Sequence, residues 1–538
     1  MTIERFIPKS PDPFIRNSQD FDVARMGHLN TLVDYVNTNL PEPGPTPPAP
    51  VIIEGSGLKS TLRIDATNTA SGDYSGVLAG STNCATGSYS AVFSGSTNIA
   101  SAACASVFSG FTNCASGNYS SVFSGNNNAA TNNYSGVFSG NNNVSSGLHS
   151  NVVGGTFNTV SGACSIITSG QCNNITGGYS SISNGSYNNI SSLYSTIENG
   201  CCNNIGGNCS HIISGSNNNI FNGCRSIIVG SRYATISSCG EHNFIMAGYG
   251  TISGNGSGNI ILGNGGTISY GSGSTIANGG NVSIDSSSFS FLGSGFWNTI
   301  SCAGYSFLGG GTSNNITGGN YNFVGAGYQN YGGGNHNFIG SGCNNNTNLL
   351  TTCYSSIVGG YYNGIRGIQN FIGGGQFNIT CATRASIMGG DTNTASGDPS
   401  FIGGGYLNVA SGPYTFIGGG GRNLASCNNG FVGSGFLNCV TGWVSAIGGG
   451  CCNVASGCWS GVFAGGQNTA SGLHTYILGG LSNIATHDYS SVVGCAVTSR
   501  LACALHANRL VLTNIPTASA GLPSGAVWSN AGVLTIVP

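Results

Sequence analysis

Charged side chains are scarce in this sequence. Asp, Glu, Lys and Arg make up 5% of the 538 residues, whereas about 25% is usual in soluble domains. Residues 66–538 contain seven Arg, seven Asp or Glu, and no Lys. The formal net charge is −2, so the chain lacks the basic surface that binds a nucleic-acid backbone. We therefore expect no nucleic-acid partner, and a surface that is either uncharged or buried against other chains.

Long apolar segments are also missing. No run of about 20 apolar residues occurs, so we expect no membrane insertion. The first residues, MTIERFIPKSPDPFIRNSQD, lack the apolar core of a secretory signal peptide. These absences predict synthesis in a cytoplasm, followed by assembly into a larger particle.

Metal-binding motifs are absent, although the chain contains 21 cysteines. The pairs Cys201–Cys202 and Cys451–Cys452 do not have the CxxC spacing of zinc sites. Other cysteines, such as Cys84, replace apolar residues or tyrosine at equivalent repeat positions. We interpret them as free, buried small hydrophobes; disulfides between neighbouring repeats, such as Cys209 with Cys224, are the alternative. No metal and no cofactor is predicted.

What the sequence does contain is a repeat of 15 residues. Asparagine recurs at this interval in two long blocks, and glycine stands three residues before most of these asparagines. The asparagines are Asn68, Asn83, Asn98, Asn113, Asn128, Asn143, Asn158, Asn173, Asn188, Asn203 and Asn218, then Asn363, Asn378, Asn393, Asn408, Asn423, Asn438, Asn453, Asn468 and Asn483. A short, fixed period is typical of a stacked array, in which each unit buries its apolar residues against its neighbours.

A second column of residues predicts the fold. A β-branched residue recurs at one position of each repeat, which is typical of a strand, and the load of Gly, Ser and Asn excludes helix. The members are Val77, Val92, Val107, Val122, Val137, Val152, Ile167, Ile182, Ile197, Ile212 and Ile227. We predict an all-β parallel β-solenoid (β-roll) with this column inside. Each coil would have two strands of about five residues and two tight turns, and about 29 coils at about 4.8 Å each would form a rod about 140 Å long.

Aromatic residues beside this column predict self-association. Successive strand residues face opposite ways, so the neighbours of an inward Val or Ile lie outside. The predicted interface residues are Phe93, Phe108, Phe123, Phe138, Phe401, Phe416 and Phe431. A strand that is apolar on both faces is buried on both faces. We therefore expect several identical chains to pack around an axis, with these residues toward it; a monomer with an exposed apolar stripe is the alternative.

Two further columns leave alternatives open. The repeated Asn either stabilises a turn through side-chain hydrogen bonds or stacks inside the coil as an amide ladder. A Tyr column that includes Tyr74, Tyr89 and Tyr119 is expected on the same outer face as the Phe residues. It forms either part of the interface or a sugar-binding stripe.

The flanking segments differ from the repeat. Residues 1–40 are a predicted attachment segment with a short helix, and the helix side chains Met26, Leu29, Val33 and Val36 follow a coiled-coil spacing. Residues 41–50 are a Pro-rich linker and residues 51–66 initial strands. Residues 67–495 are the solenoid body, with insertions at about 235–298 interpreted as longer turns on one side. Residues 496–538 are a predicted C-terminal β cap with a hairpin signal.

The repeats resemble those of a known family. Units such as GGYLNVASGPYTFIGGG and GGQNTASGLHTYILGG are similar to the GxxNxAxGxxSxAxG units of trimeric autotransporter adhesin heads, which are left-handed parallel β-rolls joined as trimers. The segments FDVARMGHLNTLVDYVN and IPTASAGLPSGAVWSNAGVLTIV resemble attachment segments of bacteriophage virion proteins and C-terminal segments of phage tail-fibre and head-fibre proteins. Together these resemblances imply a bacteriophage virion fibre with an adhesin-like β-roll, in which three identical chains form a homotrimer, intertwined or side by side.

No catalytic constellation accompanies the repeat. Glycoside hydrolysis needs paired carboxylates, and the seven acids of the solenoid are spread over many coils. We expect a non-enzymatic structural fibre on the virion surface, assembled in the host cytoplasm. Its partners would be copies of itself, other virion proteins through residues 1–40, and a host-surface glycan or protein. A cellular trimeric adhesin or surface fibre is one alternative, and a polysaccharide-degrading tailspike is another.

Overall fold

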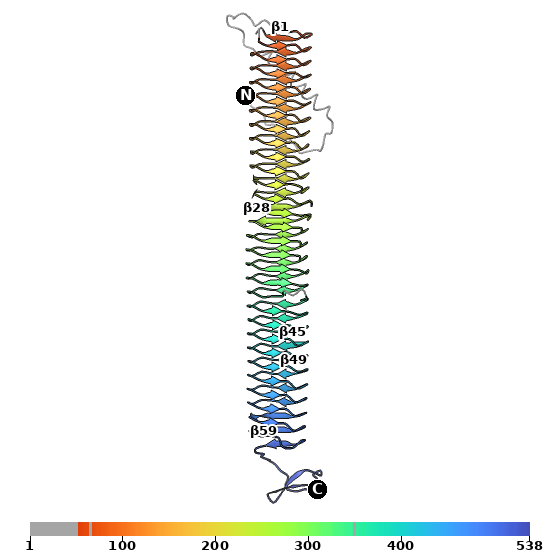
Figure 1. The fold of residues 1–538 in the computed structure, drawn as a ribbon, viewed down its shortest axis with the longest axis vertical. Coiled ribbons are helices and arrows are strands. Elements are labelled where there is room, and N and C mark those ends of the chain that lie inside the picture. Colours follow the sequence, from red (N-terminus) through yellow and green to blue (C-terminus); the bar gives the residue numbers. More distant parts are fainter. Residues whose placement is uncertain (1–51, 64–66, 348–350) are drawn as a thin grey trace, which may run out of the picture.

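The molecule is a long rod (Figure 1). The computed structural model describes residues 52–63, 67–347 and 351–538, and it confirms an all-β parallel solenoid of about 29 turns. No described residue is in a helix, so this part of the chain holds no helix able to cross a membrane. The predicted attachment segment and linker lie outside the described residues, as do Met26, Leu29, Val33 and Val36.

Each turn contributes one short strand to each of two parallel sheets. In sheet A, Val122 pairs in register with Val107 and Val137, and in sheet B Ala115 pairs with Ala100 and Ala130. The strands of these turns are β7 (Ile99–Ala100), β8 (Ser106–Val107), β9 (Cys114–Ala115), β10 (Ser121–Val122), β11 (Ala129–Ala130) and β12 (Gly136–Val137). The same pattern repeats along the rod, so every strand is covered by the turns before and after it.

The ends of the two sheets define the length of the solenoid. Sheet A runs from β2 (Thr61–Arg63) to β60 (Leu505–Ala507), and sheet B from β3 (Thr69–Ala70) to β58 (Ile484–Ala485). The first strand, β1 (Ile52–Glu54), is antiparallel to β2. Strands longer than three residues are β28 (Phe244–Ala247), β30 (Ile260–Gly263), β57 (Tyr476–Leu481), β59 (Ser491–Cys495), β61 (Val527–Asn530) and β62 (Val533–Ile536).

The path of one coil differs from the predicted pair of five-residue strands and two turns. Most strands have two or three residues, and a third side carries single bridges such as Ser96 with Phe111. Three residues of a coil have positive φ, as at Gly110 (108°), Thr112 (59°) and Tyr119 (59°). Residues with a Cβ are disfavoured there by about 1–2 kcal/mol, so contacts between coils must hold these corners. The Tyr column lies at one of these corners and not on the face of a sheet, which corrects its predicted place.

Small and β-branched side chains fill the interior. In the coil that begins at Asn113, the inward residues are Asn113, Ala115, Ser120 and Val122, and none of them is exposed. Burying alternate residues of each strand in this way leaves the side chains between them on the outside. The interior is thus narrow and continuous along the rod.

The predicted inward column is buried from Val77 to Ile212, but Ile227 was assigned to it wrongly. Ile227 pairs with His211 on the outer face, and Ile228 takes the inward place beside Ile212. The coil before it has one additional residue, because the hydrogen-bonded neighbours are 16 positions apart there. A single insertion exchanges the two faces of a strand, since side chains alternate with a period of two.

Asparagine forms a buried ladder along the rod. The N–H of Asn128 donates to Oδ1 of Asn113 (3.0 Å), and the N–H of Asn143 donates to Oδ1 of Asn128 (3.0 Å). The side-chain amide of Asn128 donates to the carbonyl of Gly140 in the next coil (2.9 Å) and to that of Ser124 in its own coil (3.1 Å). The ladder alternative is therefore correct, and the same side chains also bind the backbone of the corner.

The repeated glycine follows from this ladder. Gly125 has a φ of 105°, and a Cβ at this position would collide with the carbonyl oxygen of Gly140 and with the amide of Asn128. Glycine is the residue that adopts this backbone without a steric cost. The Gly and Asn columns are consequently two parts of one corner.

The stretch around residues 235–298 keeps a period, but the period is 16 residues. In sheet B, Thr251 pairs with Thr267, and Thr267 pairs with Ser283, so the coils continue to stack where the ladder of repeated asparagines is interrupted. Farther along, Asn314 bonds to Asn298, 16 residues earlier. In that coil the extra residue lies in the turn after β35 (Thr299–Ser301), on the path from sheet B to sheet A.

The C-terminal segment forms the hairpin that the sequence signals. β61 and β62 pair antiparallel across Ala531 and Gly532, which both have positive φ, as expected of a two-residue hairpin turn. The hydrogen bonds of residues 516–538, all of which are described, stay within that segment. The hairpin extends beyond the last coil (Figure 1) and forms no hydrogen bond that would close it.

All 21 cysteines are free thiols, but the prediction that they are buried is wrong, because Cys427 is the buried one. Burial raises the pKa of the Cys427 thiol. The neighbour of Cys209 in the next coil is Arg225 and not Cys224. The N–H of Arg225 donates to the carbonyl of Asn208, just as the N–H of Tyr119, the neighbour of Cys104, donates to the carbonyl of Ala103. The added residue in this coil thus removes the proposed Cys209–Cys224 pairing.

We expect the Asn128→Ala variant to lose about 2–5 kcal/mol of unfolding free energy, because it leaves the buried N–H of Asn143 without its partner and removes the side-chain hydrogen bonds to the carbonyls of Gly140 and Ser124. Denaturant unfolding followed by circular dichroism measures the change. Asn126→Ala is the matched control, because Asn126 is exposed two residues away. Equal stability of the two variants would contradict the role given to the ladder.

Candidate functional site

A stripe of phenylalanines follows the outer face of sheet A. The rings of Phe93, Phe108, Phe123 and Phe138 stack in parallel with centroids 4.6–4.8 Å apart. We call twelve phenylalanines of this face the aromatic stripe: Phe93, Phe108, Phe123, Phe138, Phe291, Phe307, Phe323, Phe338, Phe371, Phe401, Phe416 and Phe431. All of its members are half-buried or exposed. The predicted interface residues Phe401, Phe416 and Phe431 thus stand on the same sheet as the first four.

The sequence position that supplies the phenylalanine of the stripe differs between the two halves of the rod. In the first half Phe follows the inward residue, whereas in the second half Phe precedes it and glycine follows. A Cβ added at Gly309 would lie 3.1 Å from Cε1 of Phe307, and one at Gly325 would lie 3.3 Å from Cε1 of Phe323. Each later ring therefore lies beside the glycine of its own coil. Sheet A carries one ring per coil from Phe93 to Phe138 and from Phe291 to Phe338, whereas Ser356 and Ser386 interrupt the rings farther along.

Between Phe138 and Phe291 polar residues interrupt the stripe, although Phe244 lies on the same face. Nε2 of His211 lies 3.1 Å from Oε1 of Glu198, and both side chains are partly exposed. Apolar residues return at Ile227, which pairs with His211. The face is consequently apolar at both ends and mixed in this central window.

The acidic residues of the solenoid are each held by their own neighbour. Asp73 accepts from the Leu58 N–H (3.0 Å), Glu198 contacts His211 (3.1 Å), Glu241 contacts Arg225 (2.6 Å), Asp285 contacts Ser269, Asp391 accepts from the Thr392 hydroxyl (2.6 Å), Asp398 contacts Arg384 (3.2 Å) and Asp488 accepts from the Leu473 N–H (2.8 Å). No two of them share a partner. Among the described residues, no cluster of three or more His, Cys, Asp or Glu is placed to hold a metal.

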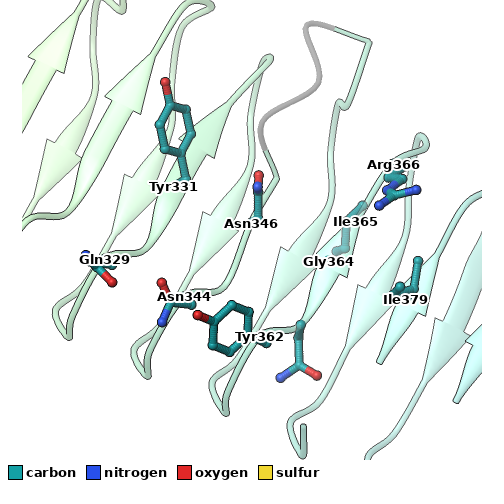
Figure 2. A pocket seen from close by; sticks show the side chains of 10 residues that line it. Gln329, Tyr331, Asn344, Asn346, Tyr362, Gly364, Ile365, Arg366 and Ile379 are labelled. Atoms are coloured by element: carbon teal, nitrogen blue, oxygen red, sulfur yellow. The ribbon is translucent and has the colours of Figure 1, made fainter. Parts of the chain in front are cut away.

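A groove lies on the outer face of sheet B (Figure 2). It has a volume of ≈ 730 Å³. Its lining residues are Gln329, Tyr331, Asn344, Asn346, Tyr362, Asn363, Gly364, Ile365, Arg366 and Ile379. Asn346 and Gly364 lie between Tyr331 and Ile379, and Asn344 and Tyr362 lie along the neighbouring corner (Figure 2).

The groove arises from two exceptions in one column. The outward residue that opens each strand of sheet B, from Thr69 to Ile484, is a glycine at Gly364 alone and an aromatic residue at Tyr331 alone. A Cβ added at Gly364 would have no atom within 4 Å. The side chain of Tyr331 thus bounds the groove on one side, and the absence of a side chain at Gly364 makes the groove deeper.

The groove was not predicted from the sequence. The signal for it was the glycine at 364 and the 18-residue spacing of Asn345 and Asn363, which appear in the sequence only as irregularities of the repeat. The chain matches no protein-family model and no curated protein. Its function must therefore be argued from the stripe and the groove themselves.

We expect the Gly364→Ala variant to keep or slightly exceed the wild-type stability, by about 0.5 kcal/mol, because the site is open and glycine adds entropy to the unfolded chain. Gly325→Ala is the matched comparison and should lose about 1–3 kcal/mol, because its Cβ would collide with the carbonyl oxygen of Gly340. Denaturant midpoints measure both. A loss at Gly364 equal to that at Gly325 would show that the fold itself requires glycine there.

Proposed function

We propose that the chain is a non-enzymatic, homotrimeric fibre of a bacteriophage particle, which projects from the virion and attaches to the host surface. The observation that carries this proposal is the aromatic stripe on a rod of about 29 turns. A rod of this kind suits the role of a spacer, because each coil contacts only its neighbours and the length follows from their number.

The stripe supports self-association. Large exposed apolar surfaces mark interaction sites in soluble proteins, and here the surface extends over many consecutive coils. In the single chain, Phe338, Phe416 and Phe431 are 38%, 37% and 41% exposed. A partner that covers such a surface must present an equally long, regular face. A parallel copy of the same chain has the same coil spacing and meets this requirement at every coil.

The C-terminal hairpin supports the same conclusion. Val533 and Leu534 are successive residues of β62 and therefore point to opposite faces, yet they are 66% and 56% exposed. A two-stranded hairpin alone is marginally stable in water. Both of its faces would be covered if three hairpins packed together at the end of the fibre.

The arrangement of the acids supports a non-enzymatic role. Cleavage of a polysaccharide needs two carboxylates on either side of the scissile bond. Here Glu241 and Asp398 are engaged by Arg225 and Arg384, and the other acids of the solenoid have separate partners. The tailspike alternative therefore has less support than the fibre.

The virion assignment is supported by the resemblance of the two ends to phage fibre segments. The cellular trimeric adhesin is the alternative, and the resemblance of the repeats to adhesin heads favours it. Antibodies against the rod distinguish the two, since gold labelling of phage particles from the producing culture is expected for a virion fibre. Labelling of cell envelopes alone would contradict the virion assignment.

We expect the Phe108→Asp, Phe123→Asp double variant to give monomers or aggregates where the wild-type chain sediments as a trimer, because two carboxylates per chain would be buried at the interface. Analytical ultracentrifugation measures the mass. Phe111→Asp, Phe157→Asp is the matched control, because these two phenylalanines are 55% and 54% exposed and lie outside the stripe. A trimer that survives in the first variant would show that sheet A is not the interface.

A further inference from the structure

Backbone hydrogen bonds join the described residues of successive coils along the groove on sheet B. The N–H of Thr347 donates to the carbonyl of Tyr331 (2.8 Å), and the N–H of Ile365 donates to that of Asn346 (2.8 Å). The N–H of Gly364 donates to the backbone carbonyl of Asn378 (2.8 Å). The hollow is thus made by side-chain size and not by a break in the backbone hydrogen bonds, so it is preformed.

The lining combines rings, amides and a cation. Tyr331 and Tyr362 supply aromatic surface, Gln329 and Asn344 supply amides that both donate and accept, and Arg366 supplies a guanidinium. No Asp or Glu is among the lining residues. Aromatic surface with a few polar groups is typical of small-ligand sites.

Arg366 differs from the other arginines of the rod. Arg225 and Arg384 pair with Glu241 and Asp398, and Arg232 and Arg422 lie over the rings of Tyr233 and Phe436. Within the described part of residues 67–495, Arg366 is the arginine with neither a carboxylate nor a ring as its partner. In a chain with so few charges, its guanidinium gives the groove an uncompensated positive charge.

We propose that this groove binds an acidic saccharide, a glycan segment that carries a carboxylate. The carboxylate pairs with Arg366, whose planar fork matches carboxylate geometry. Its sugar rings occupy the space above Gly364 and beside Tyr331, and their hydroxyls bond to the amides of Asn344 and Gln329. This inference rests on the proposed function and names the receptor class of the fibre.

The dimensions and position of the groove agree with this ligand. From Tyr331 to Ile379 the groove crosses three coil steps, about 14 Å at the usual strand spacing, which accommodates a short oligosaccharide. The groove belongs to sheet B, whereas the aromatic stripe belongs to sheet A. Trimer formation through the stripe therefore leaves sheet B available, and each trimer would present three grooves, which strengthens attachment through avidity.

Isothermal titration calorimetry on the full chain tests the proposal with three probes: an oligogalacturonate hexamer, an α2,8-linked sialic acid oligomer and neutral maltohexaose. We expect at least one acidic oligomer to bind at least tenfold more tightly than maltohexaose. Gly364→Val should weaken that binding at least tenfold by filling the hollow. Valine is native to this column at Val144, Val409 and Val454, so the variant should fold.

Arg366→Ser should also weaken the acidic oligomer at least tenfold, and serine is native to the equivalent place at Ser396 and Ser411. Thr394→Val and Arg422→Ser are the controls, because they make matched changes outside the groove and should bind as wild type. The proposal is overturned if neither acidic oligomer binds, if maltohexaose binds equally well, or if Gly364→Val or Arg366→Ser binds unchanged.

The groove lies within one chain, so this result is separable from the proposed trimer. The Phe108→Asp, Phe123→Asp variant should retain binding per chain if it remains soluble. Loss of the trimer with binding retained would separate the groove from the oligomer. Loss of saccharide binding in Gly364→Val with the trimer retained would support the groove and leave the fibre assignment intact.

Discussion

Buried ladders of polar side chains are the interaction on which the rest of the rod depends; the repeated asparagines form them in most coils, and Asn243, Asn259 and Ser274 form them where those asparagines are missing. Each coil turns three corners, and residues with a Cβ occupy left-handed backbone at two of them, as at Thr112 and Tyr119. That conformation is unfavourable for an isolated coil. It persists because each such asparagine joins two neighbouring coils: the backbone N–H of Asn128 donates to Oδ1 of Asn113, and its side chain binds the backbone of Gly140 and Asn143 in the next coil. A coil is therefore stable only as a member of the stack.

Repetition of one coil path also determines how side chains are arranged on the surface of the rod. When every coil has the same path, each position becomes a straight column, so one residue choice repeated along the chain creates a long stripe. Phe93 to Phe138 form such a column, and their rings stack at the coil spacing. An extended interface thus needs no special site and arises from the repeat itself. A local site requires a departure from the repeat, and Tyr331 and Gly364 provide one.

The scarcity of charge gives individual charged residues more weight. Most of the solenoid's acids and arginines are engaged with neighbours, as in Arg225 with Glu241 and Arg384 with Asp398. A guanidinium without such a partner, as at Arg366, then dominates the electrostatics of its surroundings, because few nearby charges oppose it. The rod combines a largely uncharged surface with one positively charged hollow.

The sequence by itself determined the period, the strand column from Val77 to Ile212 and the outward side of the phenylalanines, because stacked coils repeat the same environment every 15 residues. It did not determine the number of sides of a coil or the place of the Tyr column, since a corner and a strand face carry the same periodicity. A one-residue insertion places the side chain of Ile227 on the outer face, because the length of a turn decides which residues of the next strand point inward. Only the tertiary structure decided that Tyr331, Asn344, Gly364 and Arg366 line one groove, because these residues come from successive coils and meet through their stacking.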